Sequence, residues 1–205
     1  MRACRGFALP IALVGVVAIS LAAAQMVRAV DTTTAVAGNL VLRGQTMATA
    51  AYAVEQALGA LDDPDAIPDR EHDFAARGYY ASRLAGEDPR GIPRALQGIQ
   101  VDASVAFRQP DANGTAAAYV IERLCLAPGP ALAPNCILAP TTGSSFPGTG
   151  GGVPVPGAAT TSAVGVPLYR VTARTDGPRG AVVVVQVQAI GGGTPRTLSW
   201  RVVAE

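Results

Sequence analysis

The feature that most limits how this chain can fold is an uncharged, strongly apolar run of 21 residues near its N-terminus, positions 7–27. A helix needs about 20 apolar residues to cross the hydrocarbon core of a bilayer, so this run is long enough to span one. Arg2 and Arg5 precede the run and Arg28 follows it. This charge balance weakly favours a cytoplasmic N-terminus, which places the rest of the chain outside the inner membrane.

Where the polar leader meets the apolar run, the sequence Arg5-Gly6-Phe7-Ala8-Leu9 resembles the cleavage site of type IV prepilins. The resemblance implies that a prepilin peptidase cuts after Gly6 and methylates the new N-terminal residue, Phe7. Only the leader, residues 1–6, would then be removed, and the apolar helix would stay on the mature protein.

Two other interpretations of this N-terminus remain open. A secretory signal has a basic start, a short apolar region and a cleavage site of small residues. Ala22-Ala23-Ala24 and Val27-Arg28-Ala29 both offer such a site, and the protein would then be a Sec-exported periplasmic binding domain. The other alternative is a plain single-span anchor that is not cleaved.

A helical pattern continues beyond the apolar run and predicts one long helix over residues 7–61, which the run Asp62-Asp63-Pro64 ends. Gly38, Gly44 and the β-branched residues 32–34 predict a bend or a loss of helix in its middle. Apolar residues recur at spacings that place them on one helix face, at Val36, Leu40, Met47, Ala51, Val54, Leu58 and Leu61.

The segment Ala37-Gly38-Asn39-Leu40, followed by Arg43 and the alanine-rich residues 50–58, is similar to the N-terminal region of PilX-type minor pilins. Glu55 falls about one helical turn later than in the family pattern. The similarity implies an α+β, type IV pilin-like fold, in which a long N-terminal helix, transmembrane in its first half, packs on a C-terminal antiparallel sheet. It also implies a minor pilin, a structural subunit of a type IV pilus. A pseudopilin of type II secretion is the alternative with the same architecture.

The resemblance also implies a location and a set of partners. The chain would cross the inner membrane once, with its C-terminal domain in the periplasm, and would later enter the pilus on the cell surface. Its partners would be other minor pilins, the major pilin, a tip adhesin, the prepilin peptidase and the pilus assembly platform.

Position 11 departs from the common pilin pattern. Most pilins carry a glutamate fifth after the cleavage site, where it pairs inside the membrane with the N-terminal ammonium of a neighbouring subunit. Here that position is Ile11. The resemblance implies that a subunit without this carboxylate lies at the filament tip and primes assembly. The alternative is that Ile11 is only one more apolar residue of the span.

After the helix the sequence changes character twice. Residues 62–98 hold most of the acids and are predicted to be a polar connecting loop, with His72 at its surface. Residues 99–205 then alternate as in half-buried strands and form the predicted β domain, whose exposed face and edges would be contact surfaces. A flexible Gly- and Pro-rich loop is expected at 139–167. The predicted strands cover 99–107, 117–124, 168–175, 181–189 and 197–203.

Cysteine usage agrees with export. Cys4 would leave with the leader, and the remaining pair, Cys125 and Cys136, is predicted to form a disulfide in an oxidising periplasm. Two free buried thiols are the alternative.

Charge and motif content argue against several functions. The net charge is +1 and 15% of residues are charged, so no basic field favours nucleic acid. The acids lack the spacing of a calcium loop, and no serine or cysteine nucleophile lies near His72. We therefore expect no enzyme activity, no metal site and no cofactor.

Overall fold

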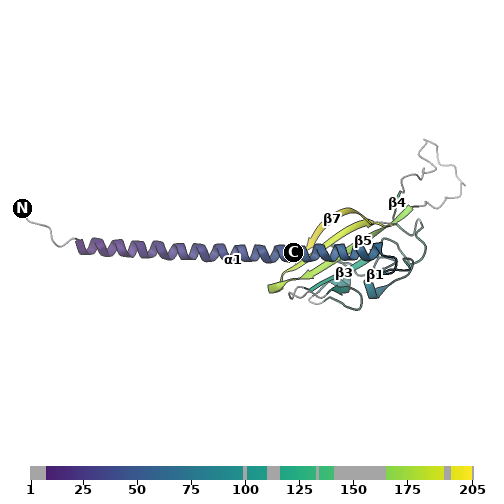
Figure 1. The fold of residues 1–205 in the computed structure, drawn as a ribbon, viewed down its shortest axis with the longest axis horizontal. Coiled ribbons are helices and arrows are strands. Elements are labelled where there is room, and N and C mark those ends of the chain that lie inside the picture. Colours follow the sequence, from purple (N-terminus) through teal and green to yellow (C-terminus); the bar gives the residue numbers. More distant parts are fainter. Residues whose placement is uncertain are drawn as a thin grey trace, which may run out of the picture. The chain divides into compact units, whose positions relative to one another are not determined.

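The structure is a computed structural model that describes residues 8–98, 101–109, 116–132, 134–140, 165–191 and 195–204 (Figure 1). The chain divides into two units, Met1–Gly44 and Gln45–Glu205, and helix α1 contributes to both. The elements in chain order are α1 (Ala8–Asp62), the 3-10 turn η1 (Ala75–Arg77), β1 (Tyr79–Tyr80), the 3-10 turn η2 (Arg94–Leu96), β2 (Phe107–Gln109), β3 (Ala116–Arg123), β4 (Leu138–Pro140), β5 (Gly165–Asp176), the 3-10 turn η3 (Pro178–Gly180), β6 (Val182–Ile190) and β7 (Arg196–Ala204).

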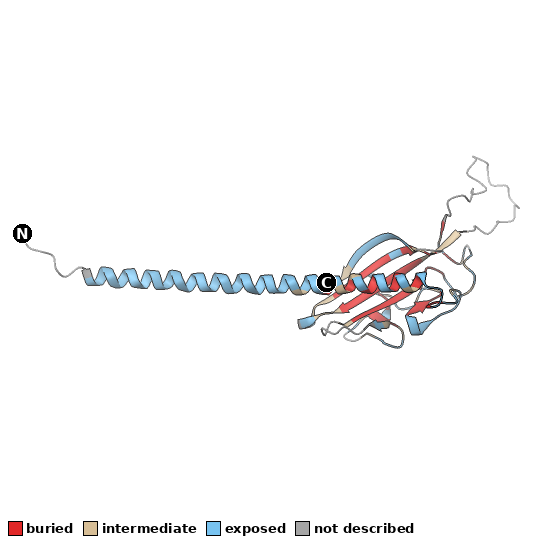
Figure 2. Ribbon diagram, in the orientation of Figure 1, coloured by how far each residue is buried: buried red, intermediate tan, exposed pale blue. Residues whose placement is uncertain are grey.

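The first unit consists, over its described residues, of α1 from Ala8 to Gly44. The helix continues through Gly38, so the predicted loss of helix in its middle is wrong. The hydroxyls of Thr32 and Thr33 donate to the Ala29 carbonyl at 2.9 and 2.7 Å, which satisfies these polar atoms within the helix. Nearly every residue of this stretch is exposed (Figure 2).

The second unit contains a seven-stranded sheet with the order β1-β3-β5-β6-β7, in which β2 also pairs with β3 and β4 with β5. The short β1 pairs with β3 in parallel, and the other pairs are antiparallel. The predicted strands at 117–124, 168–175, 181–189 and 197–203 correspond to β3, β5, β6 and β7. A long N-terminal helix packed on a mostly antiparallel sheet confirms the predicted α+β class.

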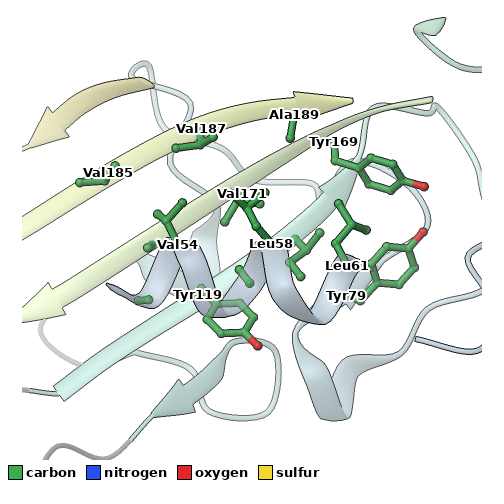
Figure 3. Packing of buried hydrophobic residues seen from close by; sticks show 14 of the residues in the cluster. Val54, Leu58, Leu61, Tyr79, Tyr119, Tyr169, Val171, Val185, Val187 and Ala189 are labelled. Carbon is green, nitrogen blue, oxygen red and sulfur yellow. The ribbon is translucent and has the colours of Figure 1, made fainter. Parts of the chain in front are cut away.

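The core of this unit lies between one face of the sheet and the last part of α1 (Figure 3). Ala50, Ala53 and Ala57 are fully buried, and their small side chains allow the helix to lie close to the strands. At the end of the helix, Arg70 donates to the Leu61 carbonyl at 2.5 Å and satisfies one of the free terminal acceptors. The larger core side chains are Val54, Leu58, Leu61, Tyr79, Tyr119, Tyr169, Val171, Val185 and Val187.

The opposite face of the sheet is also covered, in contrast to the exposed face that the sequence predicts. Tyr80, Ile92 and Leu96 come from the segment predicted to be a solvated loop, and they pack with Val120 of β3 and Val184 of β6 in a second cluster. Tyr80 donates its hydroxyl to the Val105 carbonyl at 2.8 Å, and burial raises the pKa of this phenol to about 12. The segment 62–98 is therefore part of the domain core and not only a connection.

Two further predictions need correction. The strand expected over 99–107 is largely absent, because residues 103–105 form a turn and β2 begins at Phe107; positions 99 and 100 lie outside the described residues. The ends of the loop expected at 139–167 are paired strands, since Ala139 of β4 lies opposite Val166 of β5. The remainder of that loop, 141–164, lies outside the described residues.

Candidate functional site

The apolar surface of the first unit is the most extensive candidate site. By length and composition α1 can cross a membrane, and none of its most apolar 18-residue stretch is buried. Ser20 donates its hydroxyl to the Val16 carbonyl at 2.8 Å, so its polar atoms are satisfied within the helix, as a lipid environment requires. The exposed large side chains of this stretch include Leu9, Ile11, Leu13, Val14, Val16, Val17, Ile19 and Leu21.

Among the residues predicted to matter here, Gly6 and Phe7 lie outside the described residues. Ile11 is 67% exposed, much like Leu9 and Val14 on the same helix. At this position the helix therefore offers an apolar side chain, which can lie in lipid or against another helix without a charged partner.

The predicted disulfide between Cys125 and Cys136 is present, with the two sulfur atoms 2.08 Å apart. It closes an excursion of the chain between β3 and β4, which follow one another along the same edge of β5. Beside the bridge, the Ile137 amide donates to the Leu124 carbonyl at 2.9 Å, just before the chain re-enters the sheet as β4. The bridge thus fixes both ends of a Pro- and Ala-rich loop.

Replacing both cysteines with serine should lower the free energy of unfolding by about 2–3 kcal/mol, because the open loop regains conformational freedom in the unfolded chain. Urea unfolding of the full-length protein in non-ionic detergent measures the change. Adding reductant to the unaltered protein should give a similar loss, and no additional loss in the double variant. Equal stability of the two proteins would contradict the prediction.

A buried group of charges ties the segment after β1 to the second face of the sheet. Arg170 of β5 donates to Glu122 of β3 through Nε at 3.0 Å and through Nη2 at 2.8 Å. The same guanidinium bonds both carboxylate oxygens of Glu87. The Leu84 amide donates to the other Glu122 oxygen at 2.8 Å, and Arg83 lies 3.3 Å from Glu87. One arginine thus holds two acids from segments far apart in sequence.

The pKa values of the two acids of this group, Glu122 and Glu87, are shifted in opposite directions. Burial raises the pKa of Glu122, which is 0% exposed, although the Arg170 cation opposes the effect. Hydrogen bonds from Arg170 lower the pKa of Glu87, which keeps some contact with solvent. These charges hold the segment around Leu84 and Glu87 against β3 and β5. They do not have the arrangement of a catalytic acid and base that face a cleft.

The other titratable groups offer little chemistry. His72 is exposed as predicted, and its Nδ1 lies 2.6 Å from Asp69 Oδ2. The pKa of Asp69 is lowered, first by the hydrogen bond from the Glu71 amide and then by His72. Across the described part of the chain, no three His, Cys, Asp or Glu side chains gather where they would bind a metal ion.

Comparison of the chain with protein-family models, with curated proteins and with solved structures found no match. What the geometry shows is a pilin-like architecture: an apolar, membrane-capable N-terminal helix whose last part packs on a mixed sheet, together with one disulfide in the β domain.

Proposed function

We propose that this chain is a minor pilin of the PilX type, a structural subunit of a type IV pilus. The observation that supports the proposal best is the contrast along α1. Its N-terminal stretch exposes large apolar side chains continuously, whereas Val54, Leu58 and Leu61 are buried against the sheet. A helix that is apolar and unburied over the length of a bilayer needs lipid or other helices around it.

The proposed mechanism follows from that surface. After cleavage at Gly6 the helix waits in the inner membrane, and it exchanges lipid for neighbouring helices when the subunit enters the filament. Within lipid, helices associate through close packing and not through a hydrophobic driving force. The same residues therefore serve in both environments.

The position in the filament is a further part of the proposal. With Ile11 in place of the usual acid, the subunit has no carboxylate with which to attract the N-terminus of a subunit already assembled. It acts as an early subunit near the tip and primes assembly with the other minor pilins and the tip adhesin. Restoring the acid by Ile11→Glu addresses this role.

Processing at the N-terminus tests the assignment directly. Replacing Gly6 with valine should prevent cleavage, because the peptidase cuts after this residue, and the leader should remain on the protein. N-terminal sequencing and intact mass measure the outcome. The unaltered protein should begin with methylated Phe7, and the variant with the uncut leader. A mature chain that begins at Gln25 or Val30 would show instead a discarded signal and a Sec-exported domain.

Removing the gene separates the two filament systems that share this architecture. A minor pilin predicts fewer surface filaments with normal protein secretion. A pseudopilin of type II secretion predicts the opposite result, lost secretion with normal filaments.

A further inference from the structure

Strand β7 forms a long open edge of the sheet. It pairs with β6 on one side, and it stands last in the strand order. The opposite edge is built from β1, β2 and β4, of two, three and three residues, whereas β7 has nine. From Arg196 to Val202 every residue of β7 is exposed. An exposed edge of this length offers a row of backbone donors and acceptors to an added strand.

The two faces of β7 differ sharply. Trp200 lies opposite Val187 and Val202 opposite Val185, so both stand on the apolar face that α1 covers elsewhere. They remain 43% and 39% exposed. On this face an added strand would find apolar side chains and not charges.

From Arg196 to Arg201 the other face of β7 is polar and cationic, whereas Val203 and Ala204 pack with the second cluster. Arg201 lies opposite Gln186, Ser199 opposite Gln188, and Arg196 opposite Ile190. Arg201 donates through Nε to Gln186 Oε1 at 3.0 Å, and its Nη2 donates to the same oxygen and to the Arg90 carbonyl, so the guanidinium is held on the β6 side of the strand. Neither β6 nor β7 contains an acidic residue.

These charges decide which occupant fits. A second copy of β7 placed against the first by a two-fold axis would bring Arg196 and Arg201 of both chains to one face, and neither β6 nor β7 supplies a carboxylate there. Like charges on neighbouring strands destabilise the pair, whereas opposite charges stabilise it. A strand with carboxylates on this face and apolar side chains on the other complements both faces of β7.

We propose that β7 is a docking edge for another protein, which adds an extended segment of alternating acidic and apolar residues as a further strand. Backbone hydrogen bonds hold the segment, Trp200 and Val202 contact its apolar side chains, and Arg196 and Arg201 contact its carboxylates. Strand addition of this kind takes affinity from the main chain and specificity from alternate side chains.

Trp200 is the only tryptophan of the chain and therefore reports on the edge directly. The full-length protein in phosphatidylcholine nanodiscs is titrated with three capped octapeptides. The acidic peptide alternates valine with glutamate, the basic peptide alternates valine with lysine, and the block peptide has the composition of the acidic one but places all its valines before all its glutamates. The acidic peptide should move the Trp200 emission to shorter wavelength, protect it from acrylamide, and saturate. The other two peptides should bind at least about tenfold more weakly, since each lacks the charge or the alternation.

A charge exchange distinguishes docking from loss of structure. Arg196→Glu should weaken binding of the acidic peptide about five- to tenfold and strengthen binding of the basic peptide by a similar factor, which a misfolded variant would not do. The matched control is Leu126→Thr, which removes an exposed apolar side chain of the disulfide loop and should leave both affinities unchanged. Equal binding of the two charges, no response of Trp200, or protection of Trp200 by self-association without peptide would each overturn the proposal.

Discussion

Replacing Arg170 with methionine should lower the free energy of unfolding by about 3–5 kcal/mol, because it leaves a carboxylate buried without its counter-charge. Glu122 would keep only the bond from the Leu84 amide, and Glu87 would lose both bonds to the guanidinium. Methionine retains much of the volume of the removed side chain, so the loss reflects charge more than packing. Urea unfolding of the full-length protein in detergent, followed by Trp200 fluorescence, measures the change.

The control for this variant is Arg83→Met. Arg83 also pairs with Glu87, but its side chain is 48% exposed, and such a pair contributes about 0–1 kcal/mol. The pH dependence gives a second readout. Burial already raises the pKa of Glu122, and without Arg170 it rises further. The stability that protonated Glu122 gives the variant should therefore be fully present below the ordinary glutamate pKa and be lost as the pH rises through the raised pKa. A loss as small as that of Arg83→Met, or a loss independent of pH, would contradict the prediction.

The sequence contains little sign of this charged group. Arg170 alternates with apolar residues in β5, and Glu122 stands next to Arg123 at the polar end of β3; both patterns predict side chains that face solvent. They are buried because residues 80–96 cover that face. The apolar residues of this segment are hard to recognise in the sequence, because many acidic residues surround them. The available signal was the group Ile92, Ala95 and Leu96, which follows Tyr80 by 12 to 16 residues.

The parts that could be predicted depend on regular spacing. The end of α1 at Asp62 follows from Asp62-Asp63-Pro64, and its buried face follows from Val54, Leu58 and Leu61. The strand β5 follows from the alternation of Arg170, Thr172 and Arg174 with apolar residues, and β6 follows from its run of β-branched valines. Short strands such as β1 and β4 carry too few residues for any period, and they exist because a neighbour offers an edge.

Gly78 lies where β1, β2 and β3 meet. Replacing it with alanine should lower the free energy of unfolding by about 2–5 kcal/mol. Gly78 has φ +66°, a left-handed conformation that costs other residues about 1–2 kcal/mol. A Cβ there would lie 2.8 Å from the Phe107 nitrogen and from the Tyr119 oxygen, both backbone atoms of paired strands. Overpacking of this kind adds about 1–3 kcal/mol.

Gly98→Ala separates these two contributions, because Gly98 has φ +79° and an added Cβ would meet nothing within 4 Å. It should lose only the conformational part, about 1–2 kcal/mol. The difference between the two variants in urea unfolding then measures the steric part. The Gly78 carbonyl also accepts a hydrogen bond from the Ile121 amide at 2.7 Å. A backbone shift that relieves the clash would therefore disturb the parallel pairing of β1 with β3. Equal losses in the two variants would mean that the junction moves freely and that the two adjoining strands do not constrain it.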